Sequence, residues 1–416
     1  MKIAVIGAGV TGVTTAYSLA RRGQDVTVFD RQPGPAEETS FANGGQISVS
    51  QPFPWSTPRL PGQLVRWLGR KDAPLVLKLQ KDPFMWHWAI RFLWSGRRRP
   101  FYDHAEKILK LALHSKTCLN DMVAREDIDY SRQNRGILKL FTGEKAEQEA
   151  TERRDWLRTF GVEQALLSRE ECIRIEPALT GSASGFTGGT FSPIDESGDA
   201  RHFTQALAAT AERMGVAFQY DCTITGLEKT ATDITGLSAN GQFHAFDKVI
   251  LCGGAYSRHL AKECGLSLPV YPVKGYSVSI PVEGTNIAPL TSITDETNHV
   301  VISRLGDRLR AAGTAEINGY NRTANPVRED LVLNSVMKLF PDCGDPDRAE
   351  RWCGLRPMTP DCVPLIGKTR LGNLYTNTGH GALGWTLSAG SADLVTALVL
   401  NETPPLAPED YSSFRF

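Results

Sequence analysis

Short apolar runs and segments of helical spacing follow one another along the chain. The apolar runs have the length of buried strands, and they lie at 2–6, 26–29, 217–220, 248–252 and 373–377. Helical spacing predicts helices over 13–22, 103–125, 144–160, 199–214 and 386–400. Alternating polar and apolar positions, with a turn at Gly306-Asp307, predict antiparallel strands over 276–280, 300–304 and 309–313.

This order of elements predicts an α/β fold with two kinds of sheet. A Rossmann-like, discontinuous nucleotide-binding domain is expected from segments 1–50, 197–265 and 352–416. An α+β substrate domain with a mostly antiparallel sheet is expected from segments 51–196 and 266–351. The 416 residues are enough for two or three domains.

A glycine-rich turn follows the first predicted strand. Gly7, Gly9 and Gly12 form G-x-G-x-x-G with Val10 and Thr11 inside it, and Asp30 ends the second strand. The glycines permit a tight turn, close approach of a pyrophosphate and close helix–strand packing. The carboxylate of Asp30 suits the ribose hydroxyls of a dinucleotide.

The same N-terminal run has a second interpretation. Residues 3–20 carry no charge, as in a signal peptide or a membrane span. Their glycines and hydroxyl side chains make a poor span, and no small-residue cleavage site precedes Arg21. A nucleotide-binding strand–turn–helix explains the run better.

Net charge and cysteine usage narrow the class of protein. Lys plus Arg and Asp plus Glu are 46 each, so the net charge is zero, which argues against a nucleic-acid binder. Eight cysteines are scattered without Cys-x-x-Cys pairs. We recognise no histidine at metal-ligand spacing from any of these cysteines, so no metal site is predicted. A reduced, cytoplasmic protein is expected.

A second glycine-rich loop favours FAD over NAD. The 379–385 loop, GHGALGW, lies between a predicted strand and a predicted helix. The positive end of that helix can stabilise the negative charge of a reducing flavin. The small polar segment 38–46 and the glycines after strand 248–252 suit the walls of an extended cofactor.

The motifs resemble the FAD-dependent D-amino-acid oxidase superfamily. The matching stretches are GAGVTGVTTAYSLA, ETSFANGGQIS, PIDESGDARHFTQAL, VKGYSVSI, RLRAAGTAEINGY, WCGLRPMTPDCVPLIG and NLYTNTGHGALGWTL. They extend from residue 3 to about 390. The chain departs from the family pattern at Cys362, where glycine is usual, and after Gln46, where tryptophan and arginine replace small residues.

The resemblance implies oxidation of a D-amino acid by hydride transfer to non-covalent FAD. A 2-oxo acid and ammonia are released, and the electrons pass to a quinone or another carrier. It places Arg356 at the substrate carboxylate; Tyr276 either contacts substrate or packs. It implies flavin contacts at Gly7, Gly9, Val10, Thr11, Gly12, Asp30, Arg31, Ser40, Asn43, Gly44, Gly45, Gln46, Ile47, Ile224, Gly253, Gly379, His380, Gly381, Leu383, Gly384 and Thr386.

Two interpretations of polar residues complete the sequence analysis. His380 is expected to belong to the flavin loop rather than to shuttle protons, because hydride transfer needs no general base. Asp195 and Glu196 are interpreted as turn and helix N-terminal charge.

Segment 52–101, called here the basic Trp-rich segment, is unlike the rest. It holds ten Lys and Arg against two Asp, a net charge of +8, and five of the eight tryptophans. This composition is typical of a membrane-surface segment, here the inner face of a bacterial membrane. A cap over the site, a subunit interface and, least, nucleic-acid binding are the alternatives. The oligomeric state stays open.

Overall fold

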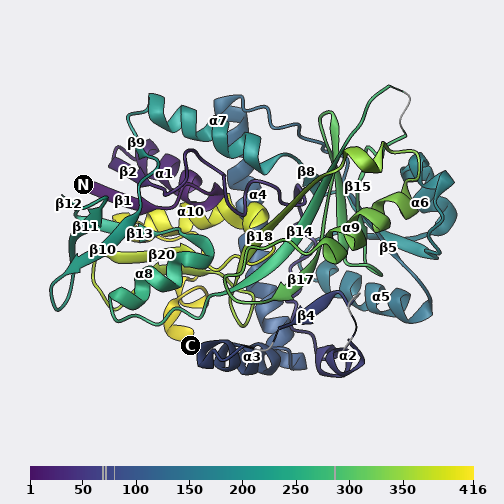
Figure 1. The fold of residues 1–416 in the computed structure, drawn as a ribbon, viewed down its shortest axis with the longest axis horizontal. Helices are drawn as coiled ribbons and strands as arrows, with labels where there is room; N and C mark the ends of the chain where they lie inside the picture. Colours follow the sequence, from purple (N-terminus) through teal and green to yellow (C-terminus); the bar gives the residue numbers. More distant parts are fainter. Residues whose placement is uncertain (68–69, 71–72, 79, 285–286) are drawn as a thin grey trace.

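The computed structural model describes residues 1–67, 70, 73–78, 80–284 and 287–416. It contains two main sheets, one of six strands and one of nine, among these residues. Figure 1 shows the six-stranded sheet with both ends of the sequence on the left and the larger sheet on the right. The combination of a mostly parallel and a mostly antiparallel sheet confirms the predicted fold class.

The six-stranded sheet brings together strands from distant parts of the chain. Its order is β19-β20-β13-β1-β2-β9, and β19 alone is antiparallel to its neighbour. β1 lies at the centre, where Ala4 pairs with Val249 and Thr27. The strands are β1 (Lys2–Ile6), β2 (Asp25–Phe29), β9 (Ala217–Gln219), β13 (Lys248–Leu251), β19 (Leu365–Lys368) and β20 (Leu374–Thr378). The five strands predicted here are observed to within one residue.

Helices cover this sheet. They are α1 (Val10–Arg21), α4 (Arg98–Glu126), α7 (Ala200–Arg213) and α10 (Gly384–Leu400). The first begins three residues before its predicted start, directly after Gly9, because a helix N-terminus closes the glycine turn. The second begins at Arg98 rather than 103, with Pro100 in its first turn, a position where proline is tolerated.

α4 and α10 cross at very close range. The Ser115 hydroxyl accepts a hydrogen bond from the Gly390 N–H at 3.0 Å. A Cβ at Gly390 would lie 2.8 Å from the backbone of Ser115. Both residues are buried, so the crossing fixes α4 against the glycine-rich loop that precedes α10.

The nine-stranded sheet has the order β18-β14-β17-β16-β15-β5-β7-β6, with β4 added beside β17. β14 and β18 are long strands paired over Tyr271–Ser279, and α9 (Pro326–Leu339) covers β14 and β17. The strands are β4 (Leu75–Leu77), β5 (Ile137–Phe141), β6 (Ala165–Ser168), β7 (Gly188–Ser192), β14 (Tyr271–Pro281), β15 (Ser292–Asp295), β16 (Val300–Leu305), β17 (Arg308–Ile317) and β18 (Glu350–Met358).

Smaller elements complete the fold. Two further sheets contain β10 (Ile224–Lys229), β11 (Ile234–Ala239) and β12 (Gln242–Ala245), and β3 (Gln46–Ile47) with β8 (Glu196–Ser197). The remaining helices are α2 (Leu60–Trp67), α3 (Pro83–Ser95), α5 (Glu144–Arg158), α6 (Arg169–Ile175) and α8 (Ser257–Glu263). The boundaries of the two expected domains stay a prediction.

The interpretation of Asp195 and Glu196 as turn and helix-end charge is wrong. Both side chains are fully buried, and it is Asp199 that caps α7. Asp195 accepts hydrogen bonds from the N–H and hydroxyl of Ser50, while burial raises its pKa to about 6. Glu196 pairs with Arg132 at 2.6 Å and with Lys116. Buried carboxylates need such partners, and both partners lie far away in the sequence.

Two general features complete the description. All eight cysteines are free thiols. None of the helices in the described part of the chain combines the length and apolarity needed to cross a bilayer.

The α4–α10 crossing generates a stability prediction. Gly390→Ala places its Cβ against the Ser115 backbone, so the two helices must separate, and overpacking of this kind costs about 1–3 kcal/mol. We expect a lower thermal midpoint, measured by circular dichroism. Gly62→Ala in α2 is the control, because its Cβ meets nothing within 4 Å. Equal midpoints for the two variants would contradict the assigned crossing.

Candidate functional site

The glycine turn between β1 and α1 has no space for side chains. Gly7 has a φ of +114°, and a Cβ on it would lie 2.6 Å from the Cys252 carbonyl oxygen. A Cβ on Gly12 would lie 1.8 Å from the carbonyl oxygen of Gly7. Gly9 is the N-cap of α1, and a Cβ on it would contact only the Ser40 hydroxyl, at 3.5 Å.

Two side chains fix the loops around this turn. The Asp30 carboxylate accepts from the N–H groups of Ala8 at 2.6 Å and Gln32 at 2.9 Å. Burial raises the pKa of Asp30, and the two backbone donors oppose that shift. Ser40 accepts from the N–H of Val10 at 3.1 Å, which holds segment 38–46 against the start of α1.

A single cavity of about 1510 Å³ extends from this turn to the inner side of the nine-stranded sheet. Most of the predicted cofactor residues line it: Gly7, Gly9, Val10, Thr11, Asp30, Arg31, Ser40, Asn43, Gly44, Gly45, Gln46, Ile224, Gly253, His380, Gly381, Leu383 and Gly384. Four others do not line it: Gly12, Ile47, Gly379 and Thr386. They support the wall, as where the Thr386 hydroxyl accepts from the Ser48 N–H at 3.0 Å.

The second glycine loop turns sharply into α10. Gly379 and Gly381 have φ values of +79° and +56°, which favour glycine. Between them His380 is buried, and its Nε2 lies 2.9 Å from the Ser391 hydroxyl. Burial lowers the His380 pKa to about 3, so the ring is neutral at physiological pH. A neutral, enclosed imidazole agrees with a loop residue rather than a proton shuttle.

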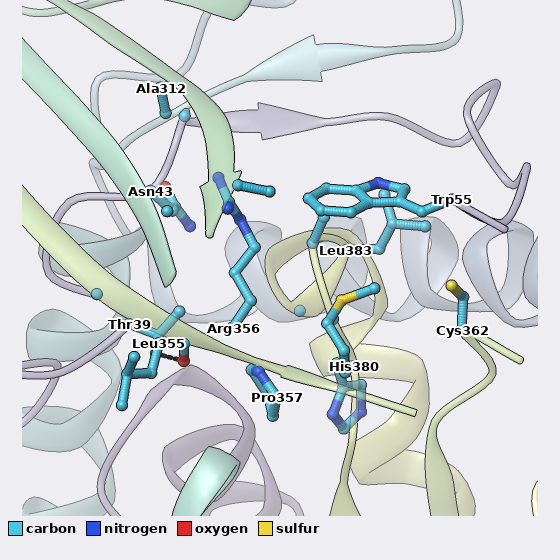
Figure 2. Close-up of a pocket in the computed structure, with 18 of the residues that line it drawn as sticks. Thr39, Asn43, Trp55, Ala312, Leu355, Arg356, Pro357, Cys362, His380 and Leu383 are labelled. Carbon is cyan, nitrogen blue, oxygen red and sulfur yellow. Dashed lines mark hydrogen bonds between the residues drawn. The ribbon is translucent and has the colours of Figure 1, made fainter. Parts of the chain in front are cut away.

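Arg356 projects from β18 into the cavity, as Figure 2 shows. Its Nη1 donates to the Thr314 carbonyl at 3.0 Å, and no carboxylate of the described residues forms an ion pair with it. Burial lowers its pKa to about 10, so it stays charged at neutral pH. Gly275 makes room for it, since a Cβ there would lie 2.1 Å from Nη1.

The Thr314 carbonyl, which accepts the hydrogen bond from Arg356, lies where the backbone of β17 is irregular. Between the pairs Lys274–Glu316 and Tyr276–Gly313, β17 contains one residue more than β14. Within this bulge Thr314 has a φ of +54°, a conformation that a β-branched residue rarely adopts. Strained residues of this kind gather at ligand sites.

Tyr276 and Arg356 belong to different faces of the sheet. Arg356 pairs with Val273 of β14, so these two side chains share a face. Tyr276 is three positions after Val273 on β14, so it lies on the opposite face, in the core under α9. The Tyr276 hydroxyl donates to the buried Glu316 carboxylate at 2.6 Å. Tyr276 also borders the cavity, so both roles that the sequence left open stay predictions.

Further residues of the cavity wall were not foreseen from the sequence. The Trp55 indole lies beside the guanidinium of Arg356, with Cζ 5.3 Å from the ring centroid. Met358 and Cys362 border the same part of the cavity. The signal for Trp55 was its place in the basic Trp-rich segment, for which a cap over the site was one of the alternatives.

The basic Trp-rich segment has two environments. Trp55 and Trp67 line the cavity, so part of the segment covers the site. In α3, Trp88 is buried and donates to the Met358 carbonyl at 3.0 Å, whereas Trp86 and Trp94 are 42% and 64% exposed. Lys71 and Asp72 of this segment lie outside the described residues.

A side-chain cluster outside the cavity corrects the sequence analysis. His114 and Cys118 are one helical turn apart on α4, and their ligand atoms lie within 4.8 Å of one another and of Asp393 on α10. Asp393 also pairs with Arg22 at 2.7 Å. Its carboxylate raises the His114 pKa to about 10, so in the absence of a metal the imidazole is protonated and pairs with Asp393. The cluster therefore ties together α1, α4 and α10.

Comparisons with known proteins cover the whole chain. The family described as FAD dependent oxidoreductase (DAO) matches residues 2–398. A protein of Paramagnetospirillum magneticum named D-amino acid dehydrogenase is 45% identical over 100% of this chain and 99% of its own length. A protein of the same name from Rhizobium rhizogenes is 42% identical over 100% of both chains.

Solved structures share the fold at lower identity. Glycine oxidase from Geobacillus kaustophilus has a TM-score of 0.79 at 22% identity, covering 100% of this chain and 98% of that one. L-proline dehydrogenase from P. horikoshii has a TM-score of 0.77 at 19% identity, covering 100% and 97%.

The cavity has the features that FAD requires. The backbone of both glycine loops faces the cavity. Segment 38–46 forms the part of the wall between the two loops. The buried indole N–H of Trp385, on its wall, has no hydrogen-bond partner among the described residues. An orphaned buried donor is rare unless a ligand supplies the acceptor.

The glycine turn generates a prediction for cofactor binding. Gly12→Ala drives its Cβ into the Gly7 carbonyl, so the turn must open. We expect most of the bound flavin to be lost, measured as the ratio of absorbance near 450 nm to that at 280 nm. Gly34→Ala is the control, because a Cβ there meets nothing within 4 Å. Retention of flavin by Gly12→Ala would contradict the role of this turn.

Proposed function

Because the chain belongs to the FAD dependent oxidoreductase family, we propose that it is a D-amino-acid dehydrogenase. It oxidises the Cα–N bond of a D-amino acid to an imine, which water hydrolyses to a 2-oxo acid and ammonia. The observation that carries this proposal is the buried guanidinium of Arg356, which faces the flavin cavity without a carboxylate partner among the described residues.

Arg356 binds the substrate carboxylate. A guanidinium offers parallel N–H donors that match the two oxygens of a carboxylate, and its charge persists when water is excluded. The Thr314 carbonyl holds one end of the group, which leaves other N–H donors for the substrate. FAD, when bound, accepts the α-hydrogen as a hydride, so the protein must orient the Cα–H bond.

The surrounding residues exclude water and handle no proton. Trp55, Met358 and Leu383 give the cavity around Arg356 an apolar wall. His380 is neutral and bonded to Ser391, so it neither donates a proton nor repels the charged guanidinium. The substrate amine must therefore arrive neutral, which predicts turnover that rises with pH toward the amine pKa.

The preference for D-amino acids is supported by the two relatives of that name. The fold alone does not support it, since a structure named L-proline dehydrogenase shares it. D-hydroxyproline or another cyclic amine as substrate, and oxygen as acceptor, remain the alternatives on this scaffold. A non-catalytic flavoprotein is the alternative of a different class.

The test is an anaerobic panel of D- and L-amino acids with the flavin absorbance as the measurement. We expect D-amino acids, including D-alanine or D-proline, to bleach the flavin and L-amino acids to leave it unchanged. Bleaching by L-amino acids alone would overturn the proposal. Dye reduction without peroxide distinguishes a dehydrogenase from an oxidase.

Arg356→Gln provides the matched variant for this panel. Loss of the charged hydrogen bonds costs about 3 kcal/mol, so we expect KM to rise about 100-fold with flavin content unchanged. Arg356→Lys restores part of this loss, because it keeps the charge but not the planar pair of donors.

We further propose that α3 rests on a membrane surface, from which a quinone takes the electrons. Four apolar side chains occupy one face of α3 and are 38% to 65% exposed: Trp86, Ile90, Leu93 and Trp94. Arg97, Arg98 and Arg99 follow directly and form no ion pair with a carboxylate of the described residues. An apolar face with adjacent cations is suited to an anionic lipid surface.

Replacing Trp86, Ile90, Leu93 and Trp94 by serine tests this surface. Loss of four apolar contacts should weaken binding to anionic vesicles at least about tenfold, measured by flotation. Trp88 is left in place, because it lies on the buried face of α3. Phe243→Ser, an exposed aromatic on β12, is the control. Unchanged flotation of the fourfold variant would refute the membrane contact.

A further inference from the structure

Three side chains of the kinds that bind transition metals converge where α4 crosses α10. His114 and Cys118 lie one turn apart on α4, and Asp393 joins them from α10. The helices cross at Ser115 and Gly390, which are close to these residues in sequence. None of the three ligand residues lines the flavin cavity. The cluster is therefore a separate feature, on the helix that follows the second glycine loop.

The spacing of the ligand atoms fits tetrahedral coordination. With metal–ligand lengths of about 2.3 Å to sulfur and 2.0 Å to nitrogen and oxygen, tetrahedral ligand atoms lie about 3.3 to 3.5 Å apart. The Cys118 sulfur is 3.4 Å from Nε2 of His114, and this Nε2 is 2.9 Å from the Asp393 carboxylate. The sulfur and the carboxylate lie within 4.8 Å of each other. The three atoms can thus reach one cation by rotation of side chains.

The donor atoms specify the class of cation. A thiolate, an imidazole and a single carboxylate suit borderline divalent ions such as Zn²⁺ and Co²⁺, whereas Mg²⁺ and Ca²⁺ prefer oxygen ligands. The side chains of His114 and Asp393 are 24% and 26% exposed, so a cation can reach the cluster from solvent. A water molecule can take the fourth position, as it does where three protein ligands hold Zn²⁺.

We propose that His114, Cys118 and Asp393 form a binding site for Zn²⁺ or another borderline divalent cation, which joins α4 to α10. The inference does not depend on the proposed function, because the site lies outside the cavity. Thiol and imidazolium must both lose a proton to ligate a metal. Two protons therefore leave as the divalent cation enters, and the total charge of the cluster does not change.

Arg22 distinguishes a metal site from a network of ion pairs. It pairs with the Asp393 carboxylate at 2.7 Å and with Glu402 at 3.1 Å. In a cluster that serves only as an ion-pair network, Arg22→Gln removes a contact and creates no metal affinity. At a metal site Arg22 repels the cation, so we expect Arg22→Gln to bind Co²⁺ about tenfold more tightly than the wild type.

The test is titration of the flavin-bound protein with Co²⁺ while its thiols are kept reduced. Tetrahedral Co²⁺ has visible bands at longer wavelengths than the oxidised flavin, so its binding can be followed in the holoenzyme. We expect the bands to saturate at one Co²⁺ per chain and to disappear when Zn²⁺ displaces it. Zn²⁺ should also raise the thermal midpoint, because it binds the folded chain. Absence of saturable bands would overturn the proposal.

Two variants remove one ligand each. Cys118→Ser and Asp393→Asn should both weaken Co²⁺ binding at least about 100-fold, since even an outer-shell partner of a metal site is worth up to that much. Cys118→Ser leaves the ion pair between His114 and Asp393 in place, so it tests the site without removing that contact between α4 and α10. Unchanged Co²⁺ bands in Cys118→Ser would contradict the assignment.

Two matched controls exclude adventitious binding. Cys353→Ser removes the other thiol that is only partly buried. His202→Ala removes a histidine whose Nδ1 lies 3.8 Å from the Asp199 carboxylate, a comparable pair elsewhere in the fold. Both variants should bind Co²⁺ as tightly as the wild type. Losses equal to that of Cys118→Ser would show that the bands arise from scattered surface ligands, and the proposal would fail.

Discussion

The charge of Arg356, buried without a carboxylate partner among the described residues, is the constraint on which the site depends. Removing a guanidinium from water is costly unless dipoles or a ligand replace the water. Here the Thr314 carbonyl supplies one such dipole, and it points inward because β17 bulges at a strained residue. Gly275 supplies the space for the group. The nine-stranded sheet is thus irregular where it meets the cavity, and under the proposed function the substrate carboxylate would complete the pairing.

The sequence predicted the local elements of the fold well and the long-range contacts poorly. The strand–turn–helix around Gly7 and Gly12 is encoded within thirty residues, so spacing alone is sufficient. The burial of Glu196 depends on Arg132 and Lys116, which no local pattern connects to it. The faces of Tyr276 and Arg356 follow from the register of β14 against β18, which no local pattern in either strand sets.

The two sheets divide the work at the site. The six-stranded sheet and its loops form the half of the cavity that fits the cofactor, and β18 delivers Arg356 from the other sheet. Structures named glycine oxidase and L-proline dehydrogenase share this architecture at 22% and 19% identity. Because proteins named for different substrates share this fold, the fold alone does not determine the substrate.

The central position of β1 has a consequence for how the protein is made. β1 is synthesised well before its neighbour β13, which spans Lys248–Leu251, and before β20, which spans Leu374–Thr378. Contacts this distant in sequence form slowly, and the apolar N-terminal strand must wait for them exposed. The second glycine loop follows β20, so a nascent chain cannot enclose the flavin before α10 is synthesised. We therefore expect a chain that stops before α10 to bind no flavin.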